Sequence, residues 1–146
     1  MATTEQIEVL MEQLKKAPPA ECFQNFDMST AGIRAILKIL NETDGKATAG
    51  YLSEQMKVST ARIAVLLKKM EAKGFIEKEH DSADGRVVVV KLSNHGKELA
   101  DKFKANLYSH IGEMIDKIGM DRMLEFAAVS NEIQSLMKKS HPKLDI

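Results

Sequence analysis

Residues 48–92 decide the fold of this chain and read TAGYLSEQMKVSTARIAVLLKKMEAKGFIEKEHDSADGRVVVVKL. Thr48 and Ser59 are each placed to cap the start of a short helix, with a tight break at Lys57-Val58 between the two helices. Apolar residues of the second helix recur at helical spacing: Ile63, Leu66, Leu67 and Met70. Gly74 is placed to end this helix in the left-handed conformation.

After Gly74 the pattern changes from helical to alternating. Phe75–His80 and Val87–Leu92 predict two strands. The polar, glycine-containing residues 81–86 between them are typical of a hairpin loop. Two adjacent short helices followed at once by a β-hairpin is the element order of a winged helix-turn-helix.

The helix pair also has the internal spacing of a helix-turn-helix. Ser53 is small where the helices would cross, Lys57 follows four residues later in the turn, and Ile63, ten residues after Ser53, can lock the second helix. Lys57 departs from the Gly or Asn that such a turn favours. An antiparallel helix pair in any helical core can show the same spacing, so this segment alone leaves both interpretations open.

Helical patterns also lie on the N-terminal side of this stretch. Thr4–Lys16 is amphipathic, and Pro18-Pro19 stop it. A second helix is expected from about Ser29, its N-cap, to Asn41, followed by a turn at Asp44-Gly45.

On the C-terminal side, Ser93 can cap a long helix that runs to about Ile118, where Gly119 interrupts it. Asp121 can cap a last helix. That helix carries apolar residues at Leu124, Ala128, Ile133, Leu136 and Met137.

We therefore predict a mainly α-helical fold with a small β-hairpin wing, in which terminal dimerisation helices flank a winged helix-turn-helix core. The expected divisions are an N-terminal helix for dimerisation in residues 1–28, the DNA-binding domain in 29–96, and C-terminal dimerisation helices in 97–146. Because the terminal helices carry more apolar surface than such a core can cover, we expect an obligate homodimer.

Composition sets the class of protein. The chain has 146 residues, of which 44% are hydrophobic and 29% charged, an ordinary globular balance. It has no pattern of a signal peptide or membrane span, and a single cysteine fits a reducing compartment, so we expect a soluble cytoplasmic protein that does not bind membranes. The net charge is zero. However, residues 46–104 carry twelve Lys or Arg against eight Asp or Glu, a basic centre that suits nucleic acid but also an ordinary solvated surface.

The outward side of the second helix offers candidate DNA contacts. The entering end has Ser59, Thr60, Ala61 and Arg62, and Lys68 and Lys69 follow with Lys73. Short hydroxyls and an arginine can meet base edges, whereas lysines farther along meet phosphates. A solvated amphipathic helix would also be lysine-rich on its outer side.

The hairpin loop adds Arg86 near the tip of the wing. A guanidinium there can enter a narrow minor groove, where the negative potential is strongest. Asp84, two residues earlier, could hold it by a charge-assisted hydrogen bond. The alternative is a surface ion pair without a ligand, which contributes little.

Four stretches together resemble the MarR family of multiple-antibiotic-resistance-type regulators: Leu52–Ser59, Lys68–Ile76, Asp81–Arg86 and Val90–Gly96. The similarity runs from about Ser29 to the end. It implies a twofold dimer built from the first and last two helices, and DNA binding that small phenolic or lipophilic ligands, or thiol oxidation, relieve. Val65 stands where many members place a polar or basic recognition residue, and Pro18-Pro19 interrupt a region where the family often has a longer helix.

Cys22 lies where the hydroperoxide-sensing branch of that family keeps a reactive cysteine. Its neighbours Glu21 and Phe23 do not lower a thiol pKa, so a buried structural cysteine is the expected role. The histidines His80, His95, His110 and His141 lack metal-ligand spacing. We expect no metal, no cofactor and no catalytic site.

The sequence therefore predicts a non-enzymatic transcriptional regulator, a repressor that binds a palindromic operator in double-stranded DNA as a homodimer and is released by a small aromatic or lipophilic effector. The alternatives are a winged-helix module for protein–protein interaction and a thiol-based redox regulator that uses Cys22.

Overall fold

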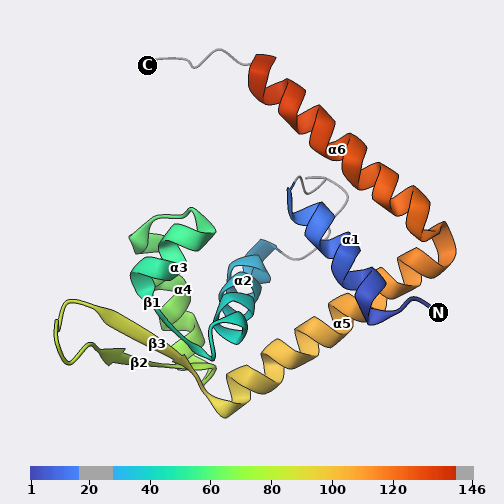
Figure 1. Ribbon diagram of the computed structural model, residues 1–146. Coiled ribbons are helices and arrows are strands. Elements are labelled where there is room, and N and C mark those ends of the chain that lie inside the picture. The colour runs from blue at the N-terminus through green and yellow to red at the C-terminus, as the bar shows by residue number, and fades with distance from the viewer. Residues whose placement is uncertain (17–27, 141–146) are drawn as a thin grey trace. The chain divides into compact units, whose positions relative to one another are not determined.

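The computed structural model describes residues 1–16 and 28–140. Within these ranges the elements follow in the order α1 (Thr4–Lys16), α2 (Met28–Glu42), β1 (Lys46–Thr48), α3 (Ala49–Met56), α4 (Thr60–Ala72), β2 (Ile76–His80), β3 (Val88–Leu92), α5 (Asn94–Ile118) and α6 (Met120–Ser140) (Figure 1). They form two compact units. The winged-helix unit is Phe26–Ala105, and the helical unit combines Met1–Asn25 with Asn106–Ile146, so α5 contributes residues to both.

The core of the winged-helix unit joins the apolar faces of α2, α3 and α4 to the sheet and the start of α5. Its buried residues are Ile33, Ile36, Leu37, Leu40, Leu52, Ile63, Leu66, Leu67, Met70, Ile76, Val90 and Ala100. All four apolar residues that define the helical spacing of α4 are among them. The predicted fold class, mainly helical with a small β wing on a winged-helix core, is confirmed.

The sheet has one more strand than the predicted hairpin. β3 lies in the centre and pairs antiparallel with β1 and β2, so that Val90 stands opposite Ala47 on one side and Lys78 on the other. β1 has three residues, too few for an alternating pattern to be recognised. Both predicted strands begin one residue later than expected, because Phe75 and Val87 belong to the connections.

The helical unit has its own smaller core, made by α1, the second half of α5 and α6. Its buried residues are Ile7, Leu10, Leu14, Ile111, Ile115, Met123 and Ala127. The amphipathic helix predicted for residues 4–16 is confirmed, and its bounds are those expected. Tyr108 on α5 also donates a hydrogen bond of 3.3 Å from its hydroxyl to Glu8 on α1.

α6 carries a second apolar face. Its exposed large apolar residues, which we call the α6 apolar row, are Phe126, Val129, Ile133, Leu136 and Met137. They recur at helical spacing, but the buried side of the helix is formed by Met123 and Ala127. Of the apolar residues expected on this helix, Leu124 packs against the core, whereas Ile133, Leu136 and Met137 are exposed.

The start of α5 is capped as predicted. The Ser93 hydroxyl accepts a hydrogen bond from the Gly96 N–H at 3.0 Å, and the Ser93 carbonyl accepts one from the Lys97 N–H at 2.9 Å. The caps predicted at Ser29 and Asp121 are wrong, because α2 begins at Met28 and α6 at Met120. Both residues therefore lie in the first turns of their helices.

Gly119 explains why Asp121 is not the cap. Its φ of 96° ends α5, with its N–H donating to the Ile115 carbonyl at 2.8 Å. Its own carbonyl accepts from the Met123 N–H at 3.2 Å, which starts α6. One glycine thus ends one helix and opens the next.

Pro18-Pro19 and Cys22 lie outside the described residues. Among the helices of the described ranges, none combines the length and the apolar character needed to span a membrane.

Candidate nucleic-acid interface

The turn between α3 and α4 depends on a left-handed lysine. Lys57 has φ 53° and ψ 43°, a conformation that glycine and asparagine adopt more easily. The N–H groups of Lys57 and Val58 donate to the Glu54 and Ser53 carbonyls at 3.3 and 3.2 Å. The Ser53 hydroxyl donates to the Val58 carbonyl at 2.7 Å. The small residue required at this position by the helix-turn-helix spacing therefore also ties the turn to α3.

α4 begins at a serine cap. The Ser59 hydroxyl accepts from the Arg62 N–H at 3.2 Å, and the Ser59 carbonyl accepts from the Ile63 N–H at 3.1 Å. The caps predicted at Ser59 and Thr48 are both confirmed, since the Thr48 hydroxyl accepts from the Tyr51 N–H at 3.0 Å. At the other end of α4, Gly74 has the expected positive φ of 75°.

The side of α4 that faces away from the core holds every predicted contact on this helix. Ser59, Thr60, Ala61, Arg62, Lys68 and Lys69 are all exposed. Val65 lies among them with 56% of its surface exposed. Lysines of the helix therefore reach solvent on the side opposite the buried apolar residues, as an amphipathic helix requires.

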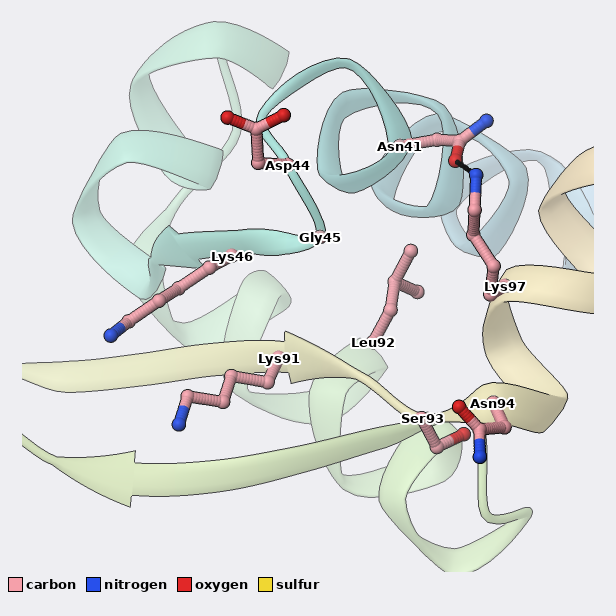
Figure 2. Close-up of a pocket in the computed structure, with 9 residues that line it drawn as sticks. All are labelled: Asn41, Asp44, Gly45, Lys46, Lys91, Leu92, Ser93, Asn94 and Lys97. Atoms are coloured by element: carbon pink, nitrogen blue, oxygen red, sulfur yellow. Dashed lines mark hydrogen bonds between the residues drawn. The ribbon is translucent and has the colours of Figure 1, made fainter.

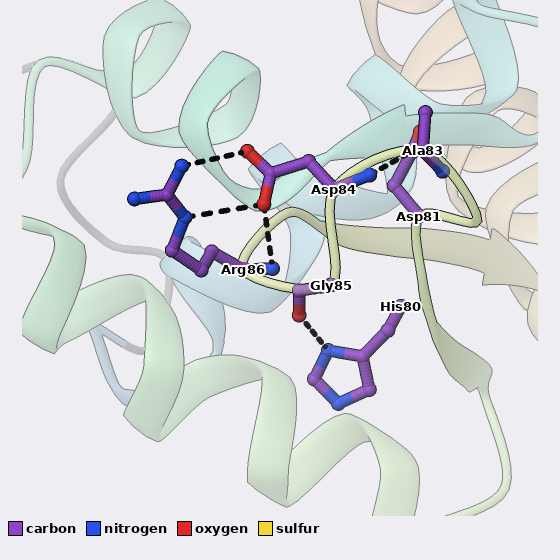
Figure 3. A network of polar contacts seen from close by, with 6 residues as sticks. All are labelled: His80, Asp81, Ala83, Asp84, Gly85 and Arg86. Atoms are coloured by element: carbon purple, nitrogen blue, oxygen red, sulfur yellow. Dashed lines mark hydrogen bonds and ion pairs between the residues drawn. The ribbon is translucent and has the colours of Figure 1, made fainter.

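The wing loop is held by its two aspartates (Figure 3). One oxygen of Asp81 accepts from the Ala83 and Asp84 N–H groups at 2.7 and 3.2 Å, an Asx turn. Asp84 accepts from the Arg86 N–H at 3.0 Å and from the Arg86 Nε and Nη2 at 3.2 and 3.4 Å. Side-chain and backbone hydrogen bonds from Arg86 lower the pKa of the Asp84 carboxyl. The Arg86 side chain is 92% exposed, so the loop presents a positioned guanidinium to solvent.

Further contacts close the wing around this loop. His80 donates from Nδ1 to the Gly85 carbonyl at 2.8 Å, which assigns the ring proton to that nitrogen. The Asp81 N–H donates to the Val87 carbonyl at 2.8 Å. Sequence reasoning missed Asp81 and His80. An aspartate at the start of a polar loop is a recognisable Asx signal, because its side chain can accept from the N–H two residues later. The contact of His80 with Gly85 depends on the folded hairpin and has no such local signal.

The Ser93–Gly96 stretch anchors the base of the wing. The Ser93 hydroxyl donates to the Gly74 carbonyl at 2.5 Å, and the Ser93 N–H donates to the Phe75 carbonyl at 3.0 Å. A Cβ atom on Gly96 would collide with the Phe75 carbonyl oxygen. The connection from α4 to β2 is therefore fixed to the start of α5, and only glycine fits at that contact.

A pocket of about 520 Å³, most of whose lining residues are polar, lies in the same unit, between the end of α2, β1 and the start of α5 (Figure 2). The Lys97 ammonium donates to the Asn41 side-chain oxygen at 2.6 Å and to Asp101 at 3.3 Å. Lys91, also at this pocket, pairs with Glu79 at 2.9 Å and thereby lowers the pKa of the Glu79 carboxyl. These contacts tie α5 to α2 and β3 to β2.

Cys22, the redox candidate, lies outside the described residues. Among the side chains that the structure describes, no group of three or more His, Cys, Asp or Glu residues converges as a metal site would require.

Comparisons with known proteins concern mainly this region. Residues 34–88 match the model of the MarR family. YcgE, an uncharacterized HTH-type transcriptional regulator of Bacillus subtilis (strain 168), is 37% identical over 67 residues, which cover 45% of this chain and 43% of that relative. The match therefore spans less than half the length of the relative.

Solved structures share the fold. FabT from Streptococcus pneumoniae, solved in complex with DNA, aligns with a TM-score of 0.63 and 16% identity over 92% of this chain and 90% of FabT. AbsC, a MarR family transcriptional regulator from Streptomyces coelicolor, aligns with a TM-score of 0.59 and 18% identity over 92% of this chain and 86% of AbsC. The resemblance expected from the helix-turn-helix and wing motifs is confirmed over residues 34–88, which match the model of the MarR family.

Proposed function

We propose that this chain is a DNA-binding transcriptional repressor that binds a palindromic operator as a homodimer and is released by a small aromatic or lipophilic effector. One observation carries the DNA-binding part. α4 buries an entirely apolar side and exposes hydroxyls, an arginine and lysines, and it shares a compact unit with a wing that holds Arg86 out into solvent. FabT, which has this fold, is a DNA-binding protein by its own complex, and this supports the same role here.

In this proposal α4 lies in the major groove. Its 13 residues form a helix about 20 Å long and roughly 10–12 Å in diameter with side chains, which a groove about 12 Å wide admits. Thr60 and Arg62 lie at the entering end and meet base edges, and Ala61 leaves room for a close approach. The Ser59 oxygen is used as the helix cap, so its hydroxyl proton is what remains to donate to a phosphate. Lys68 and Lys69, farther along, contact phosphates.

The wing lies in the adjacent minor groove. Arg86 inserts its guanidinium, and Asp84 holds it by two side-chain contacts of 3.2 and 3.4 Å. A positioned arginine loses less rotational freedom on binding than a free one. It gains most where the groove is narrow and A·T-rich.

The homodimer is supported by the α6 apolar row. Ile133 is 55% and Leu136 64% exposed. A contiguous apolar face of this kind on a protein surface is typical of an interface with another chain. A twofold dimer would present two α4 helices and two wings, which accounts for a palindromic operator. The effector rests on the family resemblance, and it must bind the DNA-incompetent arrangement more tightly than the competent one.

The test of DNA binding is fluorescence anisotropy with the full chain, DNA from upstream of its own gene and a random duplex, across a salt series. We expect tighter binding to the upstream DNA and a steep loss of affinity with salt. Lys69→Ala should weaken both duplexes equally and reduce the salt slope by about one per lost contact in each subunit. A weak, salt-independent signal on both duplexes would instead favour the protein–protein interaction module.

The effector is tested separately by thermal shift with a panel of small aromatic acids and lipophilic compounds. A compound that binds the folded chain raises the unfolding midpoint. It should also lower the affinity for operator DNA. If Cys22→Ser abolished all regulation while DNA binding persisted, the thiol-based redox mechanism would replace the effector mechanism.

A further inference from the structure

The outermost side of α4 has an apolar centre. The buried residues of the helix, Ile63, Leu66, Leu67 and Met70, define its inner side. With 3.6 residues per turn, the residues that point most directly away from them are Ala61, Val65, Lys68 and Ala72. Val65 is the only large apolar side chain exposed on α4, every residue of which the structure describes, and 56% of its surface is accessible.

Most of the positive charge lies to one side of this centre. Lys69 and Lys73, four residues apart, share one flank of the helix. Arg62 lies on the same side but at the entering end, where the first residues of a recognition helix reach the base edges. Ala61 and Ala72 are too short to cover Val65 from above or below. A helix that enters the major groove brings its centre to the base edges and its flanks to the phosphate walls. Lys68 lies on the other side of Val65 from Arg62, Lys69 and Lys73, and in the proposed complex it contacts a phosphate. The side chain left closest to the bases is therefore the branched hydrocarbon of Val65.

A branched hydrocarbon can recognise only one group on the floor of the major groove. Three of the four bases present hydrogen-bond donors and acceptors alone, which valine cannot satisfy, whereas thymine presents a C5 methyl group. Burying a donor or acceptor against valine without a partner is unfavourable, whereas burying a methyl group is favourable. Valine at this position therefore both selects thymine and disfavours the other bases.

We propose that Val65 is a specificity-determining residue that contacts the methyl group of one thymine in each half-site of the operator. The inference rests on the proposed function, because it requires α4 to enter the major groove. The hydrogen-bonded bases on either side are then left to Thr60 and Arg62. In this proposal the exposed apolar side chain of Val65 contributes to sequence recognition by contacting a thymine methyl group.

The experiment first obtains a binding site without assuming one. The full-length chain selects duplexes from a random 30-base-pair library over several rounds, and the enriched duplex serves as the probe. Each thymine of the probe is then replaced by deoxyuridine, singly and at symmetric pairs, which removes one methyl group and leaves every hydrogen bond intact. We expect one symmetric pair at which the affinity falls about fourfold per methyl, the effect of about 0.8 kcal/mol for a buried CH₂ group.

Val65→Ala should bind the thymine probe several-fold more weakly and should lose its sensitivity to deoxyuridine at that pair, because the two changes remove the same contact. The matched control is Lys69→Ala, which should weaken binding to both probes yet keep the full difference between them. Both variants should fold, since both positions are exposed on a helix and alanine is a strong helix former.

The outcomes separate this inference from the proposed function. If no sequence is enriched, sequence-specific DNA binding itself fails, and the assignment of Val65 falls with it. If a sequence is enriched but no deoxyuridine replacement weakens binding, the repressor proposal stands and the role of Val65 is overturned. That role is overturned equally if Val65→Ala retains the full deoxyuridine effect, because another residue then contacts the methyl group.

Discussion

The winged-helix unit and the helical unit treat their large apolar side chains differently. Among the described residues of the winged-helix unit, Tyr51 and Val65 are the ones left exposed. The helical unit exposes the whole α6 apolar row, together with Val9 and Ile118. The first unit thus completes its own core, whereas the second has apolar surface in excess of what its core of α1, α5 and α6 uses. The apolar surface that a dimer would cover therefore lies on the helical unit.

The largest effect is expected from placing a charge in the α6 apolar row, which tests whether this row forms the dimer interface. In a twofold interface each substitution occurs twice, and a central contact contributes about 2 kcal/mol or more. We expect Ile133→Asp to weaken the dimer on the order of 10³-fold and to give a monomer mass by light scattering at micromolar concentration. Circular dichroism should remain helical, because Ile133 does not belong to either core.

The matched control is Ser135→Asp, which adds the same charge at an exposed position of α6 outside the row. It should remain a dimer. If Ile133→Asp has the same mass as the unchanged protein, the row is not the dimer interface, and the contrast between the units has another cause.

The second test measures how far the stability of the winged-helix unit depends on close packing at the base of its wing. Gly96→Ala places a Cβ atom against the Phe75 carbonyl, a backbone group that cannot move aside easily. We expect a loss of about 1–3 kcal/mol in the free energy of unfolding, as for other overpacked sites. The measurement is urea unfolding. Gly50→Ala is the control, because no atom lies within 4 Å of the added Cβ there and alanine favours the α3 helix.

Substitutions of Arg86 and Asp84 are expected to change the affinity for operator DNA without changing the stability of the winged-helix unit. Arg86→Ala should weaken operator binding by about 1–3 kcal/mol per wing, with a smaller loss on random DNA. Asp84→Ala should give a weaker form of the same defect, since it releases the arginine without removing it. The unfolding midpoint should hardly change in either variant. Equal operator affinity of Arg86→Ala and the unchanged protein, measured by anisotropy across a salt series, would remove the wing from the DNA-binding model.

The Asp84 carboxyl also predicts a pH range for this effect. The hydrogen bonds from Arg86 lower its pKa in the folded protein, so the pair is complete above the ordinary pKa of an aspartate and is lost only as the pH falls through the lower folded value. The difference in operator affinity between Asp84→Ala and the unchanged protein should therefore be constant from about pH 5.5 to 8. A difference that disappears on moving from pH 8 to 6 would contradict the pairing.

The smallest effect is expected at Lys57. A left-handed conformation costs an ordinary residue roughly 1–2 kcal/mol, and glycine avoids this cost but is more flexible when unfolded. Lys57→Gly should therefore raise the free energy of unfolding by less than about 1 kcal/mol. Gly74→Ala is the inverse control, because it puts a Cβ at a φ of 75° in open space and should lower stability. A loss of stability in Lys57→Gly would show that the lysine side chain itself supports the turn.

Local features of the fold were predictable from the sequence, and tertiary ones were not. Thr48, Ser59 and Ser93 were predicted as caps because a cap depends on three or four neighbouring residues. β1 could not be predicted, since three residues carry no period and its pairing with β3 joins segments more than forty residues apart. The cap predicted at Asp121 was wrong because the Gly119 carbonyl accepts the first hydrogen bond of α6, a backbone contact that no side-chain pattern indicates.

In the candidate interface, too, the features set by local sequence were predictable and those set by tertiary contacts were not. The helical period of α4 was enough to place Arg62, Lys68 and Lys69 on its exposed side. The Asp84–Arg86 pair was predicted from a spacing of two residues in a hairpin loop, and the structure contains it. The contact of His80 with Gly85 and the close approach of Gly96 to Phe75 depend on how strands and helices meet, which no local pattern encodes.

The pairing of Arg86 with Asp84 has a consequence for how the protein responds to ionic strength. A free lysine that neutralises a phosphate releases condensed counterions, and the entropy gained in this way is lost as salt rises. The wing loop carries the Arg86 guanidinium together with the Asp81 and Asp84 carboxylates, so it has no excess of positive charge and its docking releases few counterions. In the proposed complex, added salt therefore removes the contribution of the α4 lysines first and leaves that of the wing. The ratio of operator to random-DNA affinity should then increase with salt even as both affinities fall, and the wing would act as the salt-resistant part of sequence discrimination.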